Sequence, residues 1–476
     1  MTTEPLTKRQ RMAIGRQEMP ARDAGERSGT FNEVNLGFTE QLALLEAQRC
    51  LACARPVCVE GCPVSVDIPS FVASIEAGDL AAAARALFGD NALPAVTGRV
   101  CPQEHQCEAV CVRGRKGAPV AIGHLERFVA DWARGHPHDD VVTSEPSGRR
   151  VAIIGAGPGG LTAAGELARR GHDVTIYEAL HLPGGVLSYG IPEFRLPNEI
   201  VDNEVDRLQA LGVHIECNVV IGRTYTLDEL RKSFDALFIS VGAGLPMFLD
   251  IPGEGFKGVY TANEYLTRVN LMRAYAFPEA DTPVLRGERV VVIGGGNVAI
   301  DAVRTARRLG ARQAMIVYRR SRPEMPARVE EVHHAEQEGV TFEFQVNPVA
   351  IEGDADRWVT GLRVIATELG EPDESGRRAP RPIAGSERVI PCDAVVVAVG
   401  TRANPLLTSS SPDLALTNRG YLAADERGMT NLPGVFAGGD IVRGSATVIL
   451  AMADGKRVAD SIDSYLSGTP VELTAP

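Results

Sequence analysis

The chain has 476 residues, which is too long for one ordinary hydrophobic core, so two or three domains are expected. Its composition is globular, and its formal net charge of −12 argues against nucleic acid as the main partner. No apolar run is long enough to span a bilayer, and the basic stretch 1–20 lacks the apolar segment of a secretory signal. We interpret this stretch as a mobile basic tail, with partner docking as the alternative.

The cysteines are unevenly placed, because seven of the nine lie within 62 residues of chain. The two runs read Cys50-x2-Cys53-x4-Cys58-x3-Cys62 and Cys101-x5-Cys107-x3-Cys111, whereas Cys217 and Cys392 stand alone and are interpreted as buried small residues. Short spacings let several thiolates reach one compact metal core. A proline directly after the last cysteine of a run, as after Cys62, is typical of ferredoxins. Zinc is the alternative, but closed zinc sites usually use two Cys-x2-Cys pairs and only one is present. In a chain without an export signal this pattern favours an iron–sulfur module in the cytoplasm over disulfides.

Residues 1–135 favour helices, with no strong strand signal, and a polar linker is expected at 135–150. The helical signals cover residues 39–49, 69–76, 80–88 and 123–133. Seven thiolates leave two four-iron clusters one ligand short, so either a polar side chain completes the second cluster or only one cluster is complete. Glu126, in the segment 123–133, is the candidate ligand, and an ordinary acid on the helix surface is the alternative.

The chain then changes to a strand–turn–helix–strand pattern. An apolar strand at 150–155 runs into Gly155-Ala-Gly157-Pro158-Gly-Gly160, which fits the dinucleotide fingerprint G-x-G-x-x-G, and a helix follows. Glu178 ends the next strand, 173–178, at the spacing expected of a ribose-binding acid. A carboxylate there accepts hydrogen bonds from a ribose diol and repels a 2′-phosphate, which predicts FAD or NAD at this site and excludes NADP.

The same pattern recurs from residue 289. A strand at 289–293 leads into Gly294-Gly-Gly296-Asn297-Val298-Ala299, which fits G-x-G-x-x-A, and a second strand covers 314–318. Arg319 and Arg320 follow that strand in place of an acid. Guanidinium groups there would hold a 2′-phosphate through charge-assisted bonds, which predicts NADP(H), with solvated surface arginines as the alternative. Two sites of different preference predict hydride transfer from a nicotinamide to a flavin.

Three further features lie between and after these units. A strand at 394–399 ends at Gly400, and a strand beginning at Gly434 ends in two glycines and Asp440. The charged, proline-containing segment 370–386 is expected to be a loop or a hairpin tip. His333 and His334, on a charged helix, are interpreted as solvated rather than catalytic.

Together these motifs resemble a known family. The chain resembles the small (beta) subunit of bacterial glutamate synthase, the N-terminal half of dihydropyrimidine dehydrogenase, and the large subunit of the electron-bifurcating NADH-dependent ferredoxin:NADP oxidoreductase. The resemblance runs from about residue 19 to 466 and rests on the cysteine runs, both glycine turns, and the motifs Met19-Pro-Ala-Arg22, Gly98-Arg-Val-Cys-Pro-Gln103 and Tyr189-Gly-Ile-Pro-Glu-Phe-Arg-Leu-Pro197.

The resemblance implies a nested architecture. A helical domain, 1–135, would carry two [4Fe-4S] clusters and precede two α/β Rossmann-like domains, with the NAD(P)H domain, 287–394, inserted into an FAD domain formed by 150–286 and 395–470. It implies that Cys50, Cys53, Cys58 and Cys111 hold one cluster, and that Cys62, Cys101, Cys107 and Glu126 hold the other. It also implies flavin contacts from Gly185, Arg195, Gly242, Gly439, Asp440, Thr447 and Val448, and nicotinamide contact from Gly400.

The function expected from these features is that of an electron-input subunit. NADPH, with NADH as a second possibility, reduces FAD, and the clusters pass single electrons to a larger redox subunit or a ferredoxin-like protein in a hetero-oligomer. The alternative runs in reverse, from a partner such as an aldehyde or 2-oxoacid oxidoreductase to NAD(P)+, including a bifurcating transhydrogenase. A disulfide reductase needs a Cys-x-x-Cys beside the flavin, which is missing after Cys111. A non-catalytic cluster-bearing scaffold conflicts with two intact dinucleotide motifs.

Overall fold

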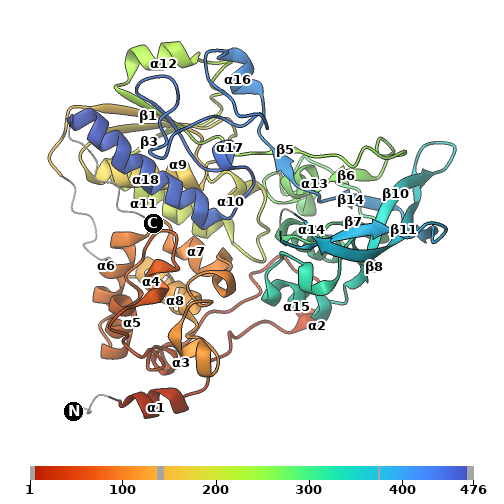
Figure 1. Ribbon diagram of the computed structural model, residues 1–476, viewed down its shortest axis with the longest axis horizontal. Helices are drawn as coiled ribbons and strands as arrows, with labels where there is room; N and C mark the ends of the chain where they lie inside the picture. The colour runs from red at the N-terminus through yellow and green to blue at the C-terminus, as the bar shows by residue number, and fades with distance from the viewer. Residues whose placement is uncertain (1–5, 137–143, 374–375, 469–476) are drawn as a thin grey trace.

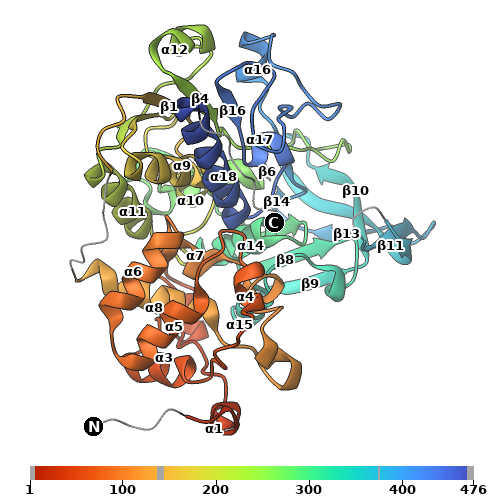
Figure 2. The ribbon, with the colours of Figure 1, turned by 60° about the vertical axis from the view of Figure 1, so that its left-hand side comes forward.

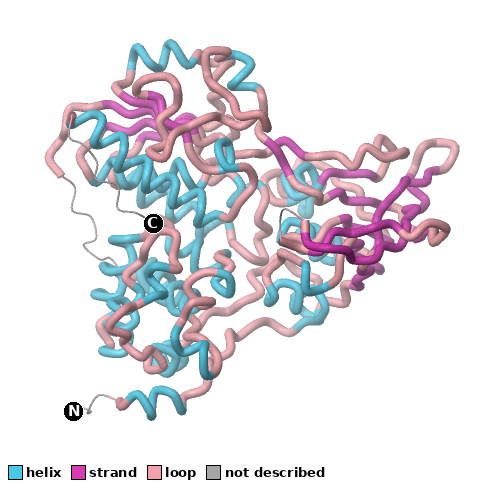
Figure 3. The backbone as a smooth tube through the Cα atoms, in the orientation of Figure 1, coloured by secondary structure: helices cyan, strands magenta, loops and turns pink. Residues whose placement is uncertain are grey.

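The computed structural model describes residues 6–136, 144–373 and 376–468. Figure 1 shows three bodies: a helical N-terminal domain, a first sheet with its helices next to it, and a second sheet on the far side of the molecule. The tube in Figure 3 separates the helical part from the two strand-rich parts. Among the described helices, none is both long and apolar enough to cross a membrane.

The N-terminal domain is helical because short, capped segments pack small apolar residues into one core. Its helices are α1 (Lys8–Ala13), α2 (Ala24–Arg27), α3 (Glu40–Ala47), α4 (Val57–Glu60), α5 (Ile68–Ala77), α6 (Leu80–Asp90), α7 (Pro94–Val100) and α8 (Ile122–Arg134), with 3-10 turns η1 (Gln103–His105) and η2 (Val112–Lys116). Asp67 and Asp79 cap α5 and α6 by accepting backbone N–H bonds. In the described part of this domain the only extended pairing is the isolated bridge Ala21–Asn35, so the helical expectation is confirmed.

The first sheet is parallel, with strand order β16-β4-β1-β2-β3. Its strands are β1 (Arg150–Ile154), β2 (Asp173–Tyr177), β3 (His214–Glu216), β4 (Ala236–Ile239) and β16 (Val435–Ala437). The helices of this part are α9 (Pro158–Arg169), α10 (Val186–Tyr189), α11 (Asn198–Ala210), α12 (Leu227–Ser233), α16 (Leu406–Ser410), α17 (Asp440–Arg443) and α18 (Val448–Ser467). Helices α9 and α18 pack closely, since a Cβ on Gly455 would lie 2.3 Å from the carbonyl oxygen of Gly159. The C-terminal helix therefore completes the fold that the first glycine turn begins.

The second sheet is also parallel, with strand order β6-β14-β7-β8-β9. Its strands are β6 (Val259–Thr261), β7 (Arg289–Ile293), β8 (Gln313–Tyr318), β9 (Thr341–Phe344) and β14 (Ala394–Val397), with helices α13 (Ala262–Val269), α14 (Asn297–Arg308), α15 (Val329–Gln337) and turns η3 (Ala274–Ala276) and η4 (Arg322–Glu324). An antiparallel sheet packs beside it: β10 (Val346–Gly353), β11 (Val359–Pro372), β12 (Arg378–Pro382) and β13 (Arg388–Pro391). The expected hairpin at 370–386 is confirmed by the β11–β12 pairing.

The chain passes between the two sheets at a two-stranded antiparallel pair, β5 (Leu245–Pro246) with β15 (Thr401–Arg402). This confirms the insertion but corrects its limits. Strand β6 and helix α13 belong to the second sheet rather than to the segment 150–286, and β14 ends at Val397 rather than at the predicted boundary of 394. The predicted boundaries at 286/287 and 394/395 are therefore wrong. Strand β6 has only three residues, and it pairs with β14, more than 130 residues later in the chain, so the local sequence does not reveal that it belongs to the second sheet.

Residues 14–39 form a strap between domains. Arg27, on α2, is buried and its Nε lies 3.1 Å from Glu338 Oε1 beyond α15, while the Val34 N–H donates to the Phe194 carbonyl at 2.9 Å. Figure 1 shows α2 directly below α15. Before the strap, Arg11 of α1 pairs with Glu76 of α5 at 2.8 Å. The interpretation of the basic N-terminal stretch as a mobile tail is therefore wrong for residues 6–20, because the ion pairs Arg11–Glu76 and Arg16–Glu108 hold it against the helical domain.

Candidate active site

The first glycine turn lies between β1 and α9. Gly155 has φ +106°, and a Cβ on Gly160 would lie 2.0 Å from the Gly155 carbonyl oxygen, so both positions require glycine. Gly157 caps α9 and has open space around its Cα hydrogens, and Pro158 occupies the first turn of the helix. The turn thus presents the free N–H groups of a helix N-terminus to an accessible cradle, as a pyrophosphate requires.

Glu178 lies at the tip of β2 beside that turn. Its carboxylate is buried and accepts the Ala156 N–H and the Leu180 N–H, both at 2.8 Å. Burial raises the pKa of Glu178, and these backbone hydrogen bonds lower it. Gly185 packs against Gly157 from the other side, with its ideal Cβ position 2.9 Å from the Gly157 Cα. The two carboxylate oxygens of Glu178 are therefore held in place beside the glycine turn.

The end of β16 adds two polar atoms to the same edge of the first sheet. In the described part of the chain, Asp440 Oδ1 and Thr447 Oγ1 are buried without a hydrogen-bond partner. Burial raises the pKa of Asp440 to about 6. Gly439, with φ +74°, caps α17, and Thr447 caps α18, whose first residue is the half-buried Val448. Buried orphan oxygens require a partner, and ligand hydroxyl groups at this edge would supply it. Gly242, after β4, has φ +68° and open space at its Cα.

The second glycine turn repeats this geometry between β7 and α14. Gly294 has φ +144°, and a Cβ there would lie 2.4 Å from the Ala398 carbonyl oxygen beyond β14. Gly296 caps α14, and Asn297 at its first position accepts the Arg328 N–H at 2.9 Å, while Val298 is half exposed. Gly400 accepts the Met247 N–H at 3.0 Å, which ties the inserted fold to the crossing strands.

The two arginines after β8 differ in environment. Arg319 is exposed, whereas Arg320 is 3% exposed, donates from Nε to the Arg378 carbonyl at 2.8 Å and pairs with Asp373. Arg322 pairs with Glu336, Nη2 to Oε2 at 2.7 Å. Arg319 is thus the accessible cation at the strand tip, whereas the guanidinium of Arg320, predicted to hold the same 2′-phosphate, already contacts Asp373 and the Arg378 carbonyl. The contacts of Arg320 with Asp373 and Arg378, which the antiparallel sheet brings close, could not be predicted from the sequence.

The seven clustered cysteines are all free thiols and separate into two neighbourhoods. In the first, burial and then the nearby Cys53 and Cys111 raise the pKa of Cys50. Burial, Cys50 and Cys111 raise the pKa of Cys58 to about 12. These four side chains are half-buried. The sequence places Cys111 more than 50 residues after the others, and the fold returns it to them.

The second neighbourhood lies deeper. Burial raises the pKa of Cys101 and of Cys107, with Glu126 and Cys62 adding to the increase in both cases. Glu126 is buried on α8, so the alternative of a surface acid is wrong. Its Oε1 accepts from Asn91 Nδ2 at 2.8 Å and from Thr97 Oγ1 at 2.5 Å, and burial raises its pKa to about 7. Among the described residues, no three His, Cys, Asp or Glu side chains lie close enough together to hold a single metal ion, whereas the ligands of a four-iron cluster each bind a different iron atom and are therefore spaced further apart.

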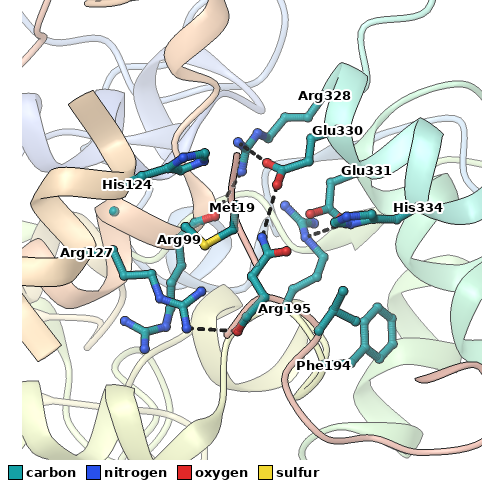
Figure 4. A pocket seen from close by; sticks show the side chains of 13 residues that line it. Met19, Arg99, His124, Arg127, Phe194, Arg195, Arg328, Glu330, Glu331 and His334 are labelled. Carbon is teal, nitrogen blue, oxygen red and sulfur yellow. Dashed lines mark hydrogen bonds and ion pairs between the residues drawn. The ribbon is translucent and has the colours of Figure 1, made fainter. Parts of the chain in front are cut away.

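A small cavity marks the junction of the three bodies (Figure 4). Arg195, from the segment before α11, reaches Asp301 of α14 with Nη1 2.7 Å from both carboxylate oxygens, and its Nε lies 3.3 Å from Glu331 of α15. Arg195 thus joins the first fold to the second. His334 lines this cavity and is 7% exposed, so the interpretation of it as solvated is wrong, whereas His333 is exposed.

The two isolated cysteines lie outside these groups. Cys392 is buried, as expected. Cys217 is only half-buried, so its interpretation as a buried residue is wrong. The short strand β3 ends just before it, at the edge of the first sheet, where fewer neighbours cover the side chain.

Two parallel sheets with glycine turns at the carboxyl ends of their first strands, behind a helical cysteine domain, define a dinucleotide-dependent oxidoreductase with an iron–sulfur domain. Residues 149–455 match the family described as pyridine nucleotide-disulphide oxidoreductase, and residues 27–137 match dihydropyrimidine dehydrogenase domain II, 4Fe-4S cluster. The chain belongs to the pyridine nucleotide-disulphide oxidoreductases, in the family of the glutamate synthase small chain.

Relatives agree with this placement, and a solved structure shares the fold. The chain is 37% identical to the glutamate synthase [NADPH] small chain of Escherichia coli, over 95% of this chain and 98% of that one. It is 41% identical to the NADP(+)-dependent formate dehydrogenase subunit beta of Moorella thermoacetica, over 86% of this chain, and the match spans only 60% of that subunit. Mycobacterium tuberculosis FprA in complex with NADPH shares the fold, with a TM-score of 0.56 at 23% identity over 68% of this chain and 85% of that one.

Proposed function

We propose that this chain is an NADPH-dependent electron-transfer subunit that carries FAD and two [4Fe-4S] clusters and serves a larger redox partner in a hetero-oligomer. The observation that carries the proposal is the opposite charge at the two strand tips: a buried carboxylate, Glu178, on the first sheet and an exposed guanidinium, Arg319, on the second. When bound, a flavin exchanges hydride with a nicotinamide and single electrons with iron–sulfur clusters, which is why such sites occur together.

The first fold is proposed to hold FAD. Its glycine turn would place helix N–H groups against the pyrophosphate, Glu178 would accept from the ribose hydroxyls, and the orphan oxygens of Asp440 and Thr447 would accept or share hydrogen bonds with the ligand. The proposed contacts are Gly155, Gly157, Pro158, Gly160, Glu178, Gly185, Gly242, Gly439, Asp440, Thr447 and Val448. Arg195 is assigned a positioning role, because Asp301 and Glu331 already occupy its guanidinium.

The second fold is proposed to hold NADPH. Gly294, Gly296, Asn297 and Val298 form the turn that would receive its pyrophosphate, and Gly400 leaves room near the nicotinamide. Arg319 would pair with the 2′-phosphate, and the buried Arg320 would support the strand tip through Asp373.

The cysteine module is proposed to hold two clusters. Cys50, Cys53, Cys58 and Cys111 would bind the outer one, and Cys62, Cys101, Cys107 and Glu126 the inner one. The support is the mutual proximity within each set, seen in the charges that raise the thiol pKa values, together with donor types suited to iron. Free thiols in all nine cysteines are consistent with a reducing compartment, and we propose the cytoplasm.

A reverse direction is the second candidate. The relative named NADP(+)-dependent formate dehydrogenase subunit beta favours a chain that returns electrons from a partner to NADP+. Both directions use the same residues, so the partner decides between them.

The test is steady-state turnover of the cluster-loaded chain under anaerobic conditions, with a neutral quinone as acceptor. NADPH is expected to support reduction of the quinone with a higher kcat/KM than NADH. Absence of turnover with both nucleotides in flavin-loaded protein would contradict the proposal. It would favour the alternative, a non-catalytic scaffold that carries clusters.

A further inference from the structure

We infer that the basic face beside the outer cysteine group is the docking surface for an acidic protein that carries a one-electron centre. The inference rests on the proposed function, which requires an electron partner, and goes beyond it by stating where that partner binds and what charge it carries. The basic face is formed by three segments: 6–16, 50–60 and 109–119.

The charge of this face is opposite to that of the whole chain. The three segments contain Lys8, Arg9, Arg11, Arg16, Arg55, Arg113, Arg115 and Lys116 but only one acid, Glu60, so their formal charge is +7, against −12 for the chain. Counting Glu76 and Glu108, which pair with Arg11 and Arg16 from outside the segments, lowers this charge by two, to +5. Lys8, Arg9, Arg55, Arg115 and Lys116 are exposed. Such local concentration of one sign attracts a partner of the opposite sign and accelerates its association.

Hydrogen bonds hold the three segments side by side. Arg11 donates from Nη1 to the Cys50 carbonyl at 3.0 Å, which fixes α1 against the start of the first cysteine run. Arg113 contacts Met12, with Nη1 3.0 Å from the sulfur, which brings η2 to the same place. The three segments therefore form one continuous surface that Arg11 and Arg113 hold together.

Internal contacts already use some of the cations. Arg11 pairs with Glu76, and Arg16 with Glu108 at 2.8 Å. Arg113 is buried. For Lys8, Arg9, Arg115 and Lys116, by contrast, the described structure shows no ion pair of the side chain, so these charges face solvent. The cations used internally shape the surface, and the remaining ones are available to a partner.

The same face contains the four cysteines of the outer group, which are less buried than Cys101 and Cys107. Cys50, Cys53, Cys58 and Cys111 are half-buried and all lie in its second and third segments, whereas Cys101 and Cys107 are buried and lie outside these segments. Val110, next to Cys111, is 42% exposed and offers an apolar contact amid the charges. Electron transfer to a protein needs close approach to a centre near the surface, and this is where the chain permits it.

The experiment compares two protein acceptors of opposite charge with the cluster-loaded full chain and NADPH: an acidic bacterial ferredoxin and the basic cytochrome c. Two double variants reverse the charge, Arg115→Glu with Lys116→Glu, and Lys8→Glu with Arg9→Glu. The second pair lies on α1, which holds no cysteine but contacts the Cys50 carbonyl through Arg11, so the iron content of each variant is measured beside its activity to separate cluster loss from weaker docking. A matched control, Arg231→Glu with Lys232→Glu, reverses an exposed pair on α12, which lies at the opposite end of the molecule from α1 in Figures 1 and 2.

At low ionic strength, each double variant of the basic face is expected to lower kcat/KM for the ferredoxin about 10-fold and to leave reduction of cytochrome c unchanged or faster. The control pair is expected to change neither, and about 0.5 M salt should remove the difference from wild type. Unchanged ferredoxin reduction in both variants, or an equal loss with both acceptors, would overturn the inference. If the wild type does not reduce the quinone with NADPH, that result instead contradicts the proposed function.

Discussion

Arg195 and Asp301 face each other across the junction of the two dinucleotide folds, with Arg195 Nη1 2.7 Å from both oxygens of the Asp301 carboxylate. Both side chains are 5% exposed. Asp301 lies on α14, the helix that the second glycine turn begins, so this pair connects that turn to the first fold. Figure 4 shows Glu331 and His334 on the same side of the junction.

Removing one member of this pair should leave the other charge buried. Arg195→Ala is expected to lower the free energy of unfolding by about 3–5 kcal/mol. Asp301→Asn, which keeps the shape, should give a smaller loss together with slower flavin reduction by NADPH in stopped-flow measurements. Arg268→Ala breaks the exposed pair with Glu264 and should cost less than about 1 kcal/mol. An Arg195→Ala protein as stable as that control would contradict a structural role of the pair.

The two arginines after β8 should respond differently to replacement. Arg319→Ala is expected to raise the KM for NADPH about 10- to 100-fold and leave the KM for NADH unchanged, because it removes charge-assisted bonds to a 2′-phosphate. Arg320→Ala should instead lower thermal stability, since it leaves Asp373 and the Arg378 carbonyl without their donor. Arg312→Ala, an exposed arginine on the same fold, is the control. Equal effects of Arg319→Ala on both nucleotides would show that this side chain does not bind the phosphate.

Glu126 can be tested by counting iron. Glu126→Ala is expected to lose about half of the iron in anaerobically purified protein and one of two overlapping EPR signals, because the inner cluster loses a ligand. Cys217→Ser is the control: it alters a half-buried cysteine outside the module and should retain the full iron content. Full iron content in Glu126→Ala would restrict Glu126 to its hydrogen bonds with Thr97 and Asn91.

Asp440 should control flavin affinity and its dependence on pH. Asp440→Ala is expected to weaken FAD binding about 10-fold, measured by flavin fluorescence on release. In the wild type a hydroxyl donor favours the ionised carboxylate, and the pKa of Asp440 is raised to about 6, so affinity should fall as the pH drops below that value. Glu426→Ala, an exposed acid in the same region, should retain the wild-type profile. A pH dependence that survives in Asp440→Ala would assign it to another group.

Features that depend on neighbours in the chain could be predicted from the sequence. Both glycine turns, the strands that enter them and the helices that leave them occur where expected, because turn geometry and helix initiation are set within a few residues. The helical cysteine domain is of this kind, and so is the acid at Glu178. The family resemblance supplied the nesting of one fold inside the other, which β5 and β15 confirm in outline.

Features that depend on distant contacts were decided only by the tertiary structure. Strand β6 is too short to be recognised and exists because β14 pairs with it. Arg320 is withdrawn from the strand tip by Asp373, 53 residues later, and His334 is buried beside a cavity that residues of the strap and of α8 also line. The N-terminal cations form a surface only because Arg11 and Arg113 join segments 39 and 101 residues apart. Local rules specify each turn, and burial and charge pairing between remote segments decide which side chains remain free to bind.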